Sequence, residues 1–206
     1  MKRDPYIKEQ LHELLYQALE TERGGIKIYE AALGCAQNED LKGEWEEYLE
    51  QTRTHEQLLL KVFEELGLNP DTVTPGREVV AHLGDSLVTA MEMAKANASA
   101  AAAQLVAGEC VVLAETKDLQ NWQLIGHLAD QGKGEETSPL KAAFDAVGEE
   151  EEHHLHHTKG FLRELWIDSL GLPAVLPPPE EVKKVETAIG AARAESQREE
   201  MLQTKH

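Results

Sequence analysis

Glutamate and histidine interrupt an apolar stripe of helical periodicity in the last third of the chain. The stripe includes Phe144 and Phe161, and Glu151 and His154 lie between them, three residues apart. This spacing places both side chains on one face of a helix. An unpaired buried carboxylate costs several kcal/mol, so a carboxylate on a core-facing side persists when it is paired or bound to a metal ion. The Glu-x-x-His pair is therefore a candidate for metal ligation.

Three other segments of the same periodicity carry ionisable residues where a leucine is expected. These residues are Glu22, His55 and Glu115, with Asp118 at the edge of the third stripe. Each one alone is more often a hydrogen-bonded core residue than a ligand. Together with Glu151 and His154 they place ionisable groups on four core-facing sides, and this agreement predicts a metal site.

The candidate ligands also agree in their height along the predicted helices. In an antiparallel pair of helices, residues at one level are equally far from the turn that joins them. The midpoint of Glu22 and His55 falls in Asn38-Glu39, and the midpoint of Glu115 and Glu151 falls in the loop around Lys133. Each pair thus lies at one level, about 25 Å from its turn at the helical rise. This level is the middle of a bundle of ordinary length.

The elements that must position these residues are long helices. The polar break at Asn38-Glu39-Asp40, the Gly67 and Pro70 terminators and the loop before Pro139 separate them. We expect an all-α, antiparallel four-helix bundle with a long, partly helical crossover at Asn69–Asp85. The expected helices span Pro5–Ala36, Leu41–Leu66, Ser86–Asp130 with a break near Asn97–Ser99, and Ser138–Leu170.

The composition changes after the Pro177-Pro178-Pro179 run. The following segment is charged and carries only a thin apolar stripe through Val182 and Val185. We expect a bundle over residues 1–176 and an extra C-terminal helix or tail over residues 177–206. A helix that docks weakly or orders on a partner and a solvated, frayed tail remain equal alternatives.

Charge and cysteine usage limit the classes of partner. The formal net charge is −18, which argues against nucleic-acid and anionic-membrane partners. The chain has two cysteines, Cys35 and Cys110, far apart in sequence, and they are read as reduced thiols. The first ten residues lack the apolar run of a signal peptide, and no stretch has the length of a membrane span. These features predict a cytoplasmic protein.

The layout of carboxylates and histidines resembles the ferritin-like superfamily of di-iron and di-manganese proteins, over about residues 5–170. That family's pattern is a Glu on each of two helices and Glu-x-x-His on each of the other two. The resemblance implies that Glu22, His55, Glu115, Glu151 and His154 are metal ligands. The segments from Tyr48 to His55 and from Lys61 to Gly67 look like the stress-associated, poorly characterised bacterial ferritin-like proteins, and then like the rubrerythrin-like branch.

One position departs from the family pattern. The residue three before His55 is Thr52, where the pattern has a bridging Glu. Gln51 is a poor substitute for a bridging carboxylate, whereas Asp118 is a candidate sixth ligand. Both one and two metal ions per chain therefore stay open.

These features lead to two hypotheses about function. The first is a protein that binds iron or manganese and reacts with O₂ or peroxide, with the ferroxidase or peroxidase chemistry that the resemblance implies. The second is a metal-free, non-catalytic helical bundle with a stress or scaffold role, which Thr52 favours. Storage or sequestration is a third and weaker alternative, which needs a large symmetric shell that no feature supports, so we expect dimerisation through an outer helix face instead. In the run of residues 149–157, Glu152, His153 and His156 are predicted to point away from the core, and Glu150 and His157 to lie at its edge.

Overall fold

The chain is all-helical in the computed structural model, which describes residues 6–132, 137–185 and 187–204. Five long helices are followed by three short ones, and the described residues contain no strand. The helices are α1 (Lys8–Leu33), α2 (Glu39–Leu66), α3 (Pro75–Asn97), α4 (Ala100–Gln131), α5 (Thr137–Ser169), α6 (Pro179–Val182), α7 (Ala188–Ser196) and α8 (Arg198–Thr204).

Local capping interactions fix where the long helices begin and end. The Asn38 side chain accepts a hydrogen bond from the Leu41 amide at the start of α2, and Gly67 ends this helix with a φ of 66°. Only glycine adopts that left-handed conformation without strain, so the helix ends where the sequence predicts. Ser99 caps α4 through the Ala102 amide. The expected break near Asn97–Ser99 is therefore confirmed.

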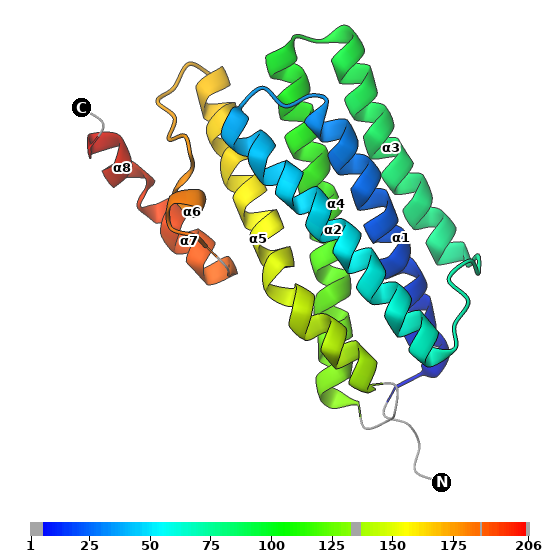
Figure 1. Cartoon of the computed structure of the whole chain (residues 1–206). Coiled ribbons are helices and arrows are strands. Elements are labelled where there is room, and N and C mark those ends of the chain that lie inside the picture. Colours follow the sequence, from blue (N-terminus) through cyan, green and yellow to red (C-terminus); the bar gives the residue numbers. More distant parts are fainter. Residues whose placement is uncertain (1–5, 133–136, 186, 205–206) are drawn as a thin grey trace.

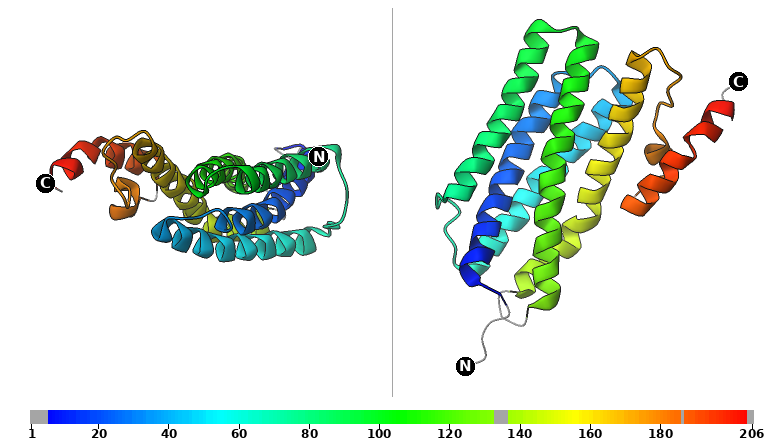
Figure 2. Two further views of the ribbon diagram at one scale, coloured as in Figure 1. Left: turned by 90° about the horizontal axis from the view of Figure 1, so that it is seen from above. Right: turned by 180° about the vertical axis from the view of Figure 1, so that it is seen from behind.

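The helices α1, α2, α4 and α5 lie side by side, as Figure 1 and the view from above in Figure 2 show. Helix α3 packs outside them against α1 and α4, and the short helices α6–α8 lie on the opposite side, beside α5. The irregular connection after α2 is thus shorter than the crossover expected over Asn69–Asp85, because α3 begins at Pro75 and itself forms most of the crossover. Helix α3 approaches α1 closely: a Cβ atom added at Gly84 would lie 3.6 Å from the Gly24 Cα atom.

Two apolar clusters fill opposite ends of the interior. One contains Tyr29, Trp45 and Phe161, and the other contains Leu15 and Trp122. Following each helix from one cluster to the other gives its direction. Helices α2 and α4 run the same way, and α1 and α5 run the opposite way. The return of the chain between α2 and α4 is made by α3.

The segment after α5 folds into three short helices rather than into one extra helix. Val175, Val185 and Ala194 are buried. The buried Glu164 carboxylate accepts hydrogen bonds from the Val175 amide and the Arg198 guanidinium. The segment is therefore packed along α5, and the expected single C-terminal helix is wrong because the chain turns at Lys183 and Gln197. The division between residues 176 and 177 stays a prediction.

None of the described helices is long and apolar enough to cross a membrane.

Candidate metal centre

The six predicted ligands lie on α1, α2, α4 and α5, in the stretches between the two apolar clusters. All of them are almost completely buried, with exposed fractions of 4% or less. They are Glu22 on α1, His55 on α2, Glu115 and Asp118 on α4, and Glu151 and His154 on α5. The helical projection therefore predicted their burial correctly.

Five of these residues form two groups of three, and Glu151 belongs to both groups. In each group the possible donor atoms lie within 4.8 Å of one another. The first group is Glu22, His55 and Glu151, and the second is Glu115, Glu151 and His154.

The separations within the groups are those of donors that converge on a common point. In the first group, His55 Nδ1 lies 2.8 Å from Glu151 Oε1 and 3.9 Å from Glu22 Oε1. In the second, His154 Nδ1 lies 3.5 Å from Glu115 Oε2 and 4.0 Å from Glu151 Oε1. The 2.8 Å contact does not have the alignment of a hydrogen bond, since His55 Nδ1 has no such partner among the described residues.

In both histidines, Nε2 makes a hydrogen bond away from the donor groups, and Nδ1 faces the carboxylates of those groups. His55 Nε2 lies 2.7 Å from Glu150 Oε2, and His154 Nε2 lies 2.7 Å from Gln51 Oε1. Both oxygens are acceptors, so each Nε2 carries the proton. In a neutral imidazole, Nδ1 then presents its lone pair to the interior. Histidine ligands of metal ions are held in this way by a second hydrogen bond.

Buried polar atoms without a hydrogen-bond partner are concentrated at this level. Each of the six predicted ligands contributes one such atom among the described residues. These atoms are Glu22 Oε2, His55 Nδ1, Glu115 Oε2, Asp118 Oδ1, Glu151 Oε2 and His154 Nδ1. Buried polar atoms in folded proteins are nearly always partnered, so a concentration of this kind indicates a position that binds a ligand.

Two aromatic residues orient the carboxylates of α1 and α4. The Tyr29 hydroxyl donates to Glu115 Oε1 at 2.8 Å, and the Trp122 indole donates to Glu22 Oε1 at 2.7 Å. Both rings are completely buried. Their hydrogen bonds to the candidate ligands were missed, because periodicity gives the face of a residue but not the direction of its polar atom.

The six candidate ligands are called the inner layer below. Its electrostatics disfavour the ionisation of all its carboxylates at once. Burial and then the neighbouring Glu151 raise the pKa of Glu22 well above its ordinary value. Burial and then Glu22 do the same to the pKa of Asp118. Burial disfavours charge on His55, but the hydrogen bond with Glu150 and the nearby carboxylates of Glu151 and Glu22 outweigh it and raise its pKa to about 10. Like charges without cations are unfavourable here.

Thr52 faces the interior but adds no ligand. It is buried, and its hydroxyl donates to the Tyr48 carbonyl. Gln51, four residues before His55, orients His154 from outside instead of joining the donor groups. The bridging position that the family pattern assigns to a Glu is thus filled by a residue without charge.

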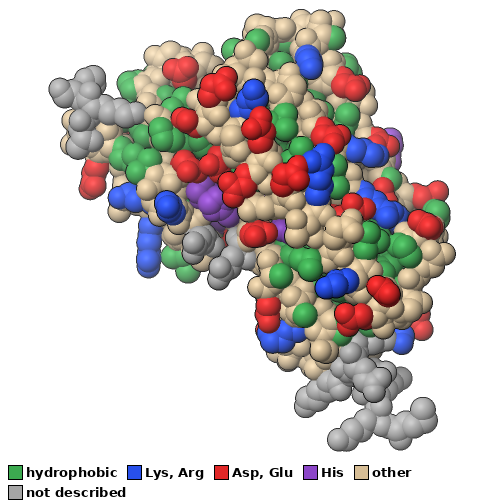
Figure 3. Space-filling view, viewed as in Figure 1, with side chains coloured by type: hydrophobic (Ala, Val, Ile, Leu, Met, Phe, Trp, Pro, Cys, Tyr) green, Lys and Arg blue, Asp and Glu red, His purple; other side chains and the backbone are tan. Residues whose placement is uncertain are grey.

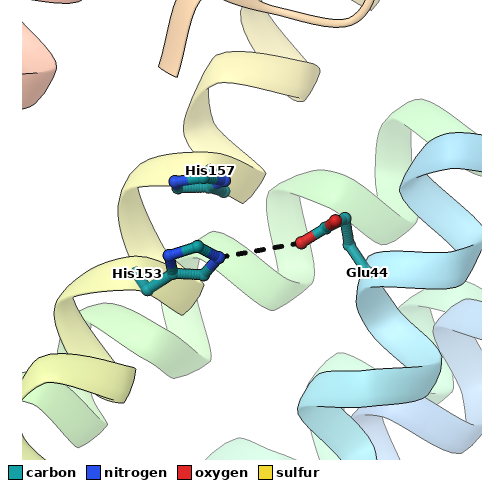
Figure 4. Close-up of side chains that lie close together, drawn as sticks. All are labelled: Glu44, His153 and His157. Atoms are coloured by element: carbon teal, nitrogen blue, oxygen red, sulfur yellow. Dashed lines mark ion pairs between the residues drawn. The ribbon is translucent and has the colours of Figure 1, made fainter. Parts of the chain in front are cut away.

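A third group lies nearer the surface. Glu44 on α2 and His153 and His157 on α5 have possible donor atoms within 4.8 Å of one another, and Figure 4 shows both imidazoles and the carboxylate. His153 was predicted to point away from the core, and 32% of its side chain is exposed. The sequence missed its partner, since the approach of Glu44 depends on how α2 packs against α5.

One family model matches the chain, over residues 7–112, and it is described as a domain of unknown function, DUF892. The matched region includes Glu22 and His55 and ends three residues before Glu115. No curated protein and no solved structure matches the chain.

Proposed function

The chain belongs to the DUF892 family, and we propose that it binds two iron or manganese ions at the layer formed by Glu22, His55, Glu115, Asp118, Glu151 and His154. The proposed activity is oxidative chemistry with O₂ or peroxide, of the ferroxidase or peroxidase type. Stress protection is the role that the resemblance implies, and the cysteines, read as reduced thiols, favour a cytoplasmic setting.

The observation that carries this proposal is the position of Glu151 in both donor groups. A carboxylate has two oxygens and can bridge two cations. Glu22 and His55 would hold one ion, Glu115 and His154 would hold the other, and the two groups would share Glu151. Glu151 thus supplies a bridge although Thr52 replaces the bridging Glu of the family pattern.

Charge balance supports two ions rather than one. The layer contains four buried carboxylates, from Glu22, Glu115, Asp118 and Glu151. Two divalent cations neutralise four ionised carboxylates, whereas one cation leaves an excess of two negative charges in the interior. Uncompensated buried charge is strongly unfavourable, so with one cation the other two carboxylates would have to stay protonated, whereas two cations balance all four.

The donor chemistry favours iron or manganese. The ligands are carboxylate oxygens and imidazole nitrogens, and no thiolate takes part among the described residues of either group. When bound, such ions supply redox chemistry toward O₂ or peroxide. The protein groups hold and orient the ligands: Tyr29 and Trp122 fix carboxylate oxygens, and Glu150 and Gln51 fix the histidine tautomers.

The order and direction of the helices support the ferritin-like assignment. Helices α2 and α4 run in the same direction, so the chain must cross the length of the molecule between them, and α3 makes that crossing. Ferritin-like four-helix folds contain one such long crossover.

Metal analysis of the Glu151→Gln variant tests the proposal. Wild-type protein loaded anaerobically with Fe(II) or Mn(II) should hold about two ions per chain. Glu151→Gln keeps the shape of the side chain but cannot bridge two cations, so the content should fall below one ion. Glu152→Gln is the matched control: Glu152 points toward the C-terminal segment, where it accepts from the Ala188 amide, and this variant should load normally. Metal content unaffected by Glu151→Gln would refute the two-ion proposal.

The rival function is a metal-free structural bundle, and Thr52 is the observation that favours it. It predicts near-zero metal in wild-type protein after loading, together with a stability change in Glu151→Gln. One ion in the wild type would instead indicate a reduced site.

Homodimerisation stays a separate prediction. Val79, Leu83 and Leu113 are exposed apolar residues on α3 and α4, and they are the first candidates for a subunit contact. Sedimentation of wild-type protein and of Leu83→Glu tests it, because a charged residue at a dimer contact should yield monomers.

A further inference from the structure

The outer group of Glu44, His153 and His157 lies where α2, α5 and the C-terminal segment meet. The two histidines are four residues apart on α5, and their rings stack with centroids 3.6 Å apart. His153 Nε2 lies 3.8 Å from Glu44 Oε2 (Figure 4). In the space-filling view, histidine side chains are visible between the C-terminal helices and the body of the molecule, among acidic residues (Figure 3).

The C-terminal segment adds a fourth donor to this group. His157 Nδ1 lies 2.5 Å from Glu181 Oε2, and His157 Nε2 lies 2.9 Å from the Val185 carbonyl oxygen. The carbonyl can only accept, so Nε2 carries a proton and donates to it. In a neutral ring, Nδ1 then presents a lone pair toward the Glu181 carboxylate. Two acceptors face each other at that point, and a positive charge is required there.

The positions of these atoms match the requirements of a metal-binding histidine. Such a histidine donates its second ring N–H to a carbonyl or carboxylate, as His157 does to Val185. Glu44 is oriented too, because the Tyr48 hydroxyl donates to its Oε2 at 2.6 Å. Two donors that each lie about 2.0–2.2 Å from a tetrahedral ion are about 3.4 Å apart. The 3.8 Å between His153 and Glu44 is near that span, and Glu181 must move back by about 1 Å.

The outer group is open to ions from solution. The side chains of Glu44, His153 and Glu181 are 23%, 32% and 28% exposed, whereas His157 is buried. It is also separate from the inner layer. The Tyr48 ring lies between them, 5.7 Å from the His153 ring and 4.3 Å from the His154 ring.

We propose that Glu44, His153, His157 and Glu181 form a second divalent-cation site, of the zinc-binding type, which fastens the C-terminal segment to α2 and α5. Two imidazoles and two carboxylates are a donor set that Zn²⁺ accepts in four-coordinate geometry. Three of the donors lie on the long helices and one on α6, so the ion joins the segment to the bundle. This site is independent of the proposed iron or manganese centre, because the two share no residue.

Zinc titration of the full chain tests the site. The titration uses the Glu151→Gln variant as its background, because this variant reduces metal binding by the inner layer. Competition with a chromogenic chelator measures the number of Zn²⁺ ions bound per chain. Adding His153→Ala to this background should remove one further equivalent. Adding Glu181→Gln should weaken that equivalent at least tenfold. The matched control is His127→Ala, which removes an exposed histidine of α4 and should change nothing. Equal zinc binding with and without His153 overturns the proposal.

Limited proteolysis tests whether Zn²⁺ fastens the C-terminal segment to α2 and α5. Zn²⁺ should slow cleavage within residues 177–204 of the wild-type chain by at least fivefold, and it should give no protection in Glu181→Gln. His153 and Glu181 are partly exposed, so circular dichroism should show an unchanged helix content in both variants. Zinc binding that requires His153 but leaves the cleavage rate unchanged overturns the fastening role.

Discussion

The imidazole rings of His55 and His154 lie nearly parallel, with centroids 5.8 Å apart and planes inclined by 20°. Their Nε2 atoms reach acceptors outside the layer, and their Nδ1 atoms face the carboxylates within it. Two helices that run in opposite directions thus present the same ring atom to the same carboxylate, Glu151. The inner layer can therefore be tested by changes that leave every candidate ligand in place.

Tyr29→Phe should weaken metal binding without removing a ligand. The Tyr29 hydroxyl holds Glu115 Oε1 at 2.8 Å, and loss of such a supporting hydrogen bond lowers metal affinity by about 10–100-fold. Titration with Mn(II) should show the loss in one of the two ions, the one that Glu115 and His154 bind.

The control is Tyr16→Phe. Tyr16 is also buried on α1 but packs against Phe63 in the apolar cluster away from Glu115. Equal Mn(II) affinities in the two variants would show that the Tyr29 hydroxyl has no part in metal binding.

The metal-free protein should lose stability between pH 7.5 and 9.5. The raised pKa values of His55, Glu22 and Asp118 mean that the folded chain holds protons which the unfolded chain has released. Stability from such groups is complete below their unfolded pKa and falls as the pH rises toward the folded one. The free energy of unfolding should drop by about 2 kcal/mol, or roughly 4–8 °C in Tm.

Thermal unfolding in the presence of a chelator measures this loss. Burial lowers the pKa of His156, so titration of this residue changes stability in the opposite direction. That change is finished below pH 7.5 and lies outside the range that is measured. Bound metal replaces the protons, so the rise in Tm on metal addition should be larger at pH 9.5 than at pH 7.5. A chelated protein with a flat or rising Tm over this range would contradict the assignment of bound protons to the layer.

Thr52→Glu should restore the second bridging carboxylate. Thr52 lies beside Gly25, where an added Cβ atom would come within 3.2 Å of the Thr52 Cγ2 atom, so the facing helix carries no side chain at this point. The metal-free variant should lose about 2–4 kcal/mol, because it buries another carboxylate. Metal should then stabilise it more than it stabilises the wild type.

Thr52→Gln is the control of equal size without the charge. Calorimetry with and without Mn(II) compares the two variants. If both gain the same stability from the metal, position 52 does not face the ions.

Glu164→Gln should release the C-terminal segment. The Glu164 carboxylate is fully buried and lies within hydrogen-bond distance of Arg163, Arg198 and the Val175 amide. Removing the charged partner of a buried ion pair costs about 3–5 kcal/mol. Proteolysis within residues 177–204 should accelerate, while the content of inner metal stays unchanged.

Glu195→Gln provides the comparison, because Glu195 approaches the same Arg163 at 3.9 Å but is 60% exposed. Its loss should be small, as for other surface ion pairs. Equal cleavage rates in the two variants would mean that Glu164 does not anchor the segment.

Periodicity and terminators predicted most of the helical architecture. The second helix was expected at Leu41–Leu66 and is found at Glu39–Leu66, and the Gly67 terminator ends it as expected. The first turns of α3 were missed. Gly76 and Gly84 weaken the helical signal of this segment, and Gly84 is there because α3 approaches the α1 backbone at Gly24. That contact between two helices forms only when the chain folds, so the sequence alone does not show why a glycine stands at this position.

The candidate ligands were predicted through their face and height, which depend on local geometry alone. The outer hydrogen bonds of His55 and His154 were not predicted, because they depend on side-chain directions across neighbouring helices. The same limit applies to Glu44 and Glu181, which reach His153 and His157 from elements far away in sequence. Whether the inner layer binds metal stays a prediction.

The place of Glu151 on the last long helix has a consequence for biosynthesis. A chain still on the ribosome that has exposed only α1 to α4 contains Glu22, His55 and Glu115 but neither Glu151 nor His154. Such an intermediate has one of the two candidate ligand histidines and lacks the shared carboxylate, so it cannot assemble either donor group. If the proposed centre forms, metal capture must wait until α5 has been made, and the ions would bind a helical body that is already assembled instead of guiding its early folding.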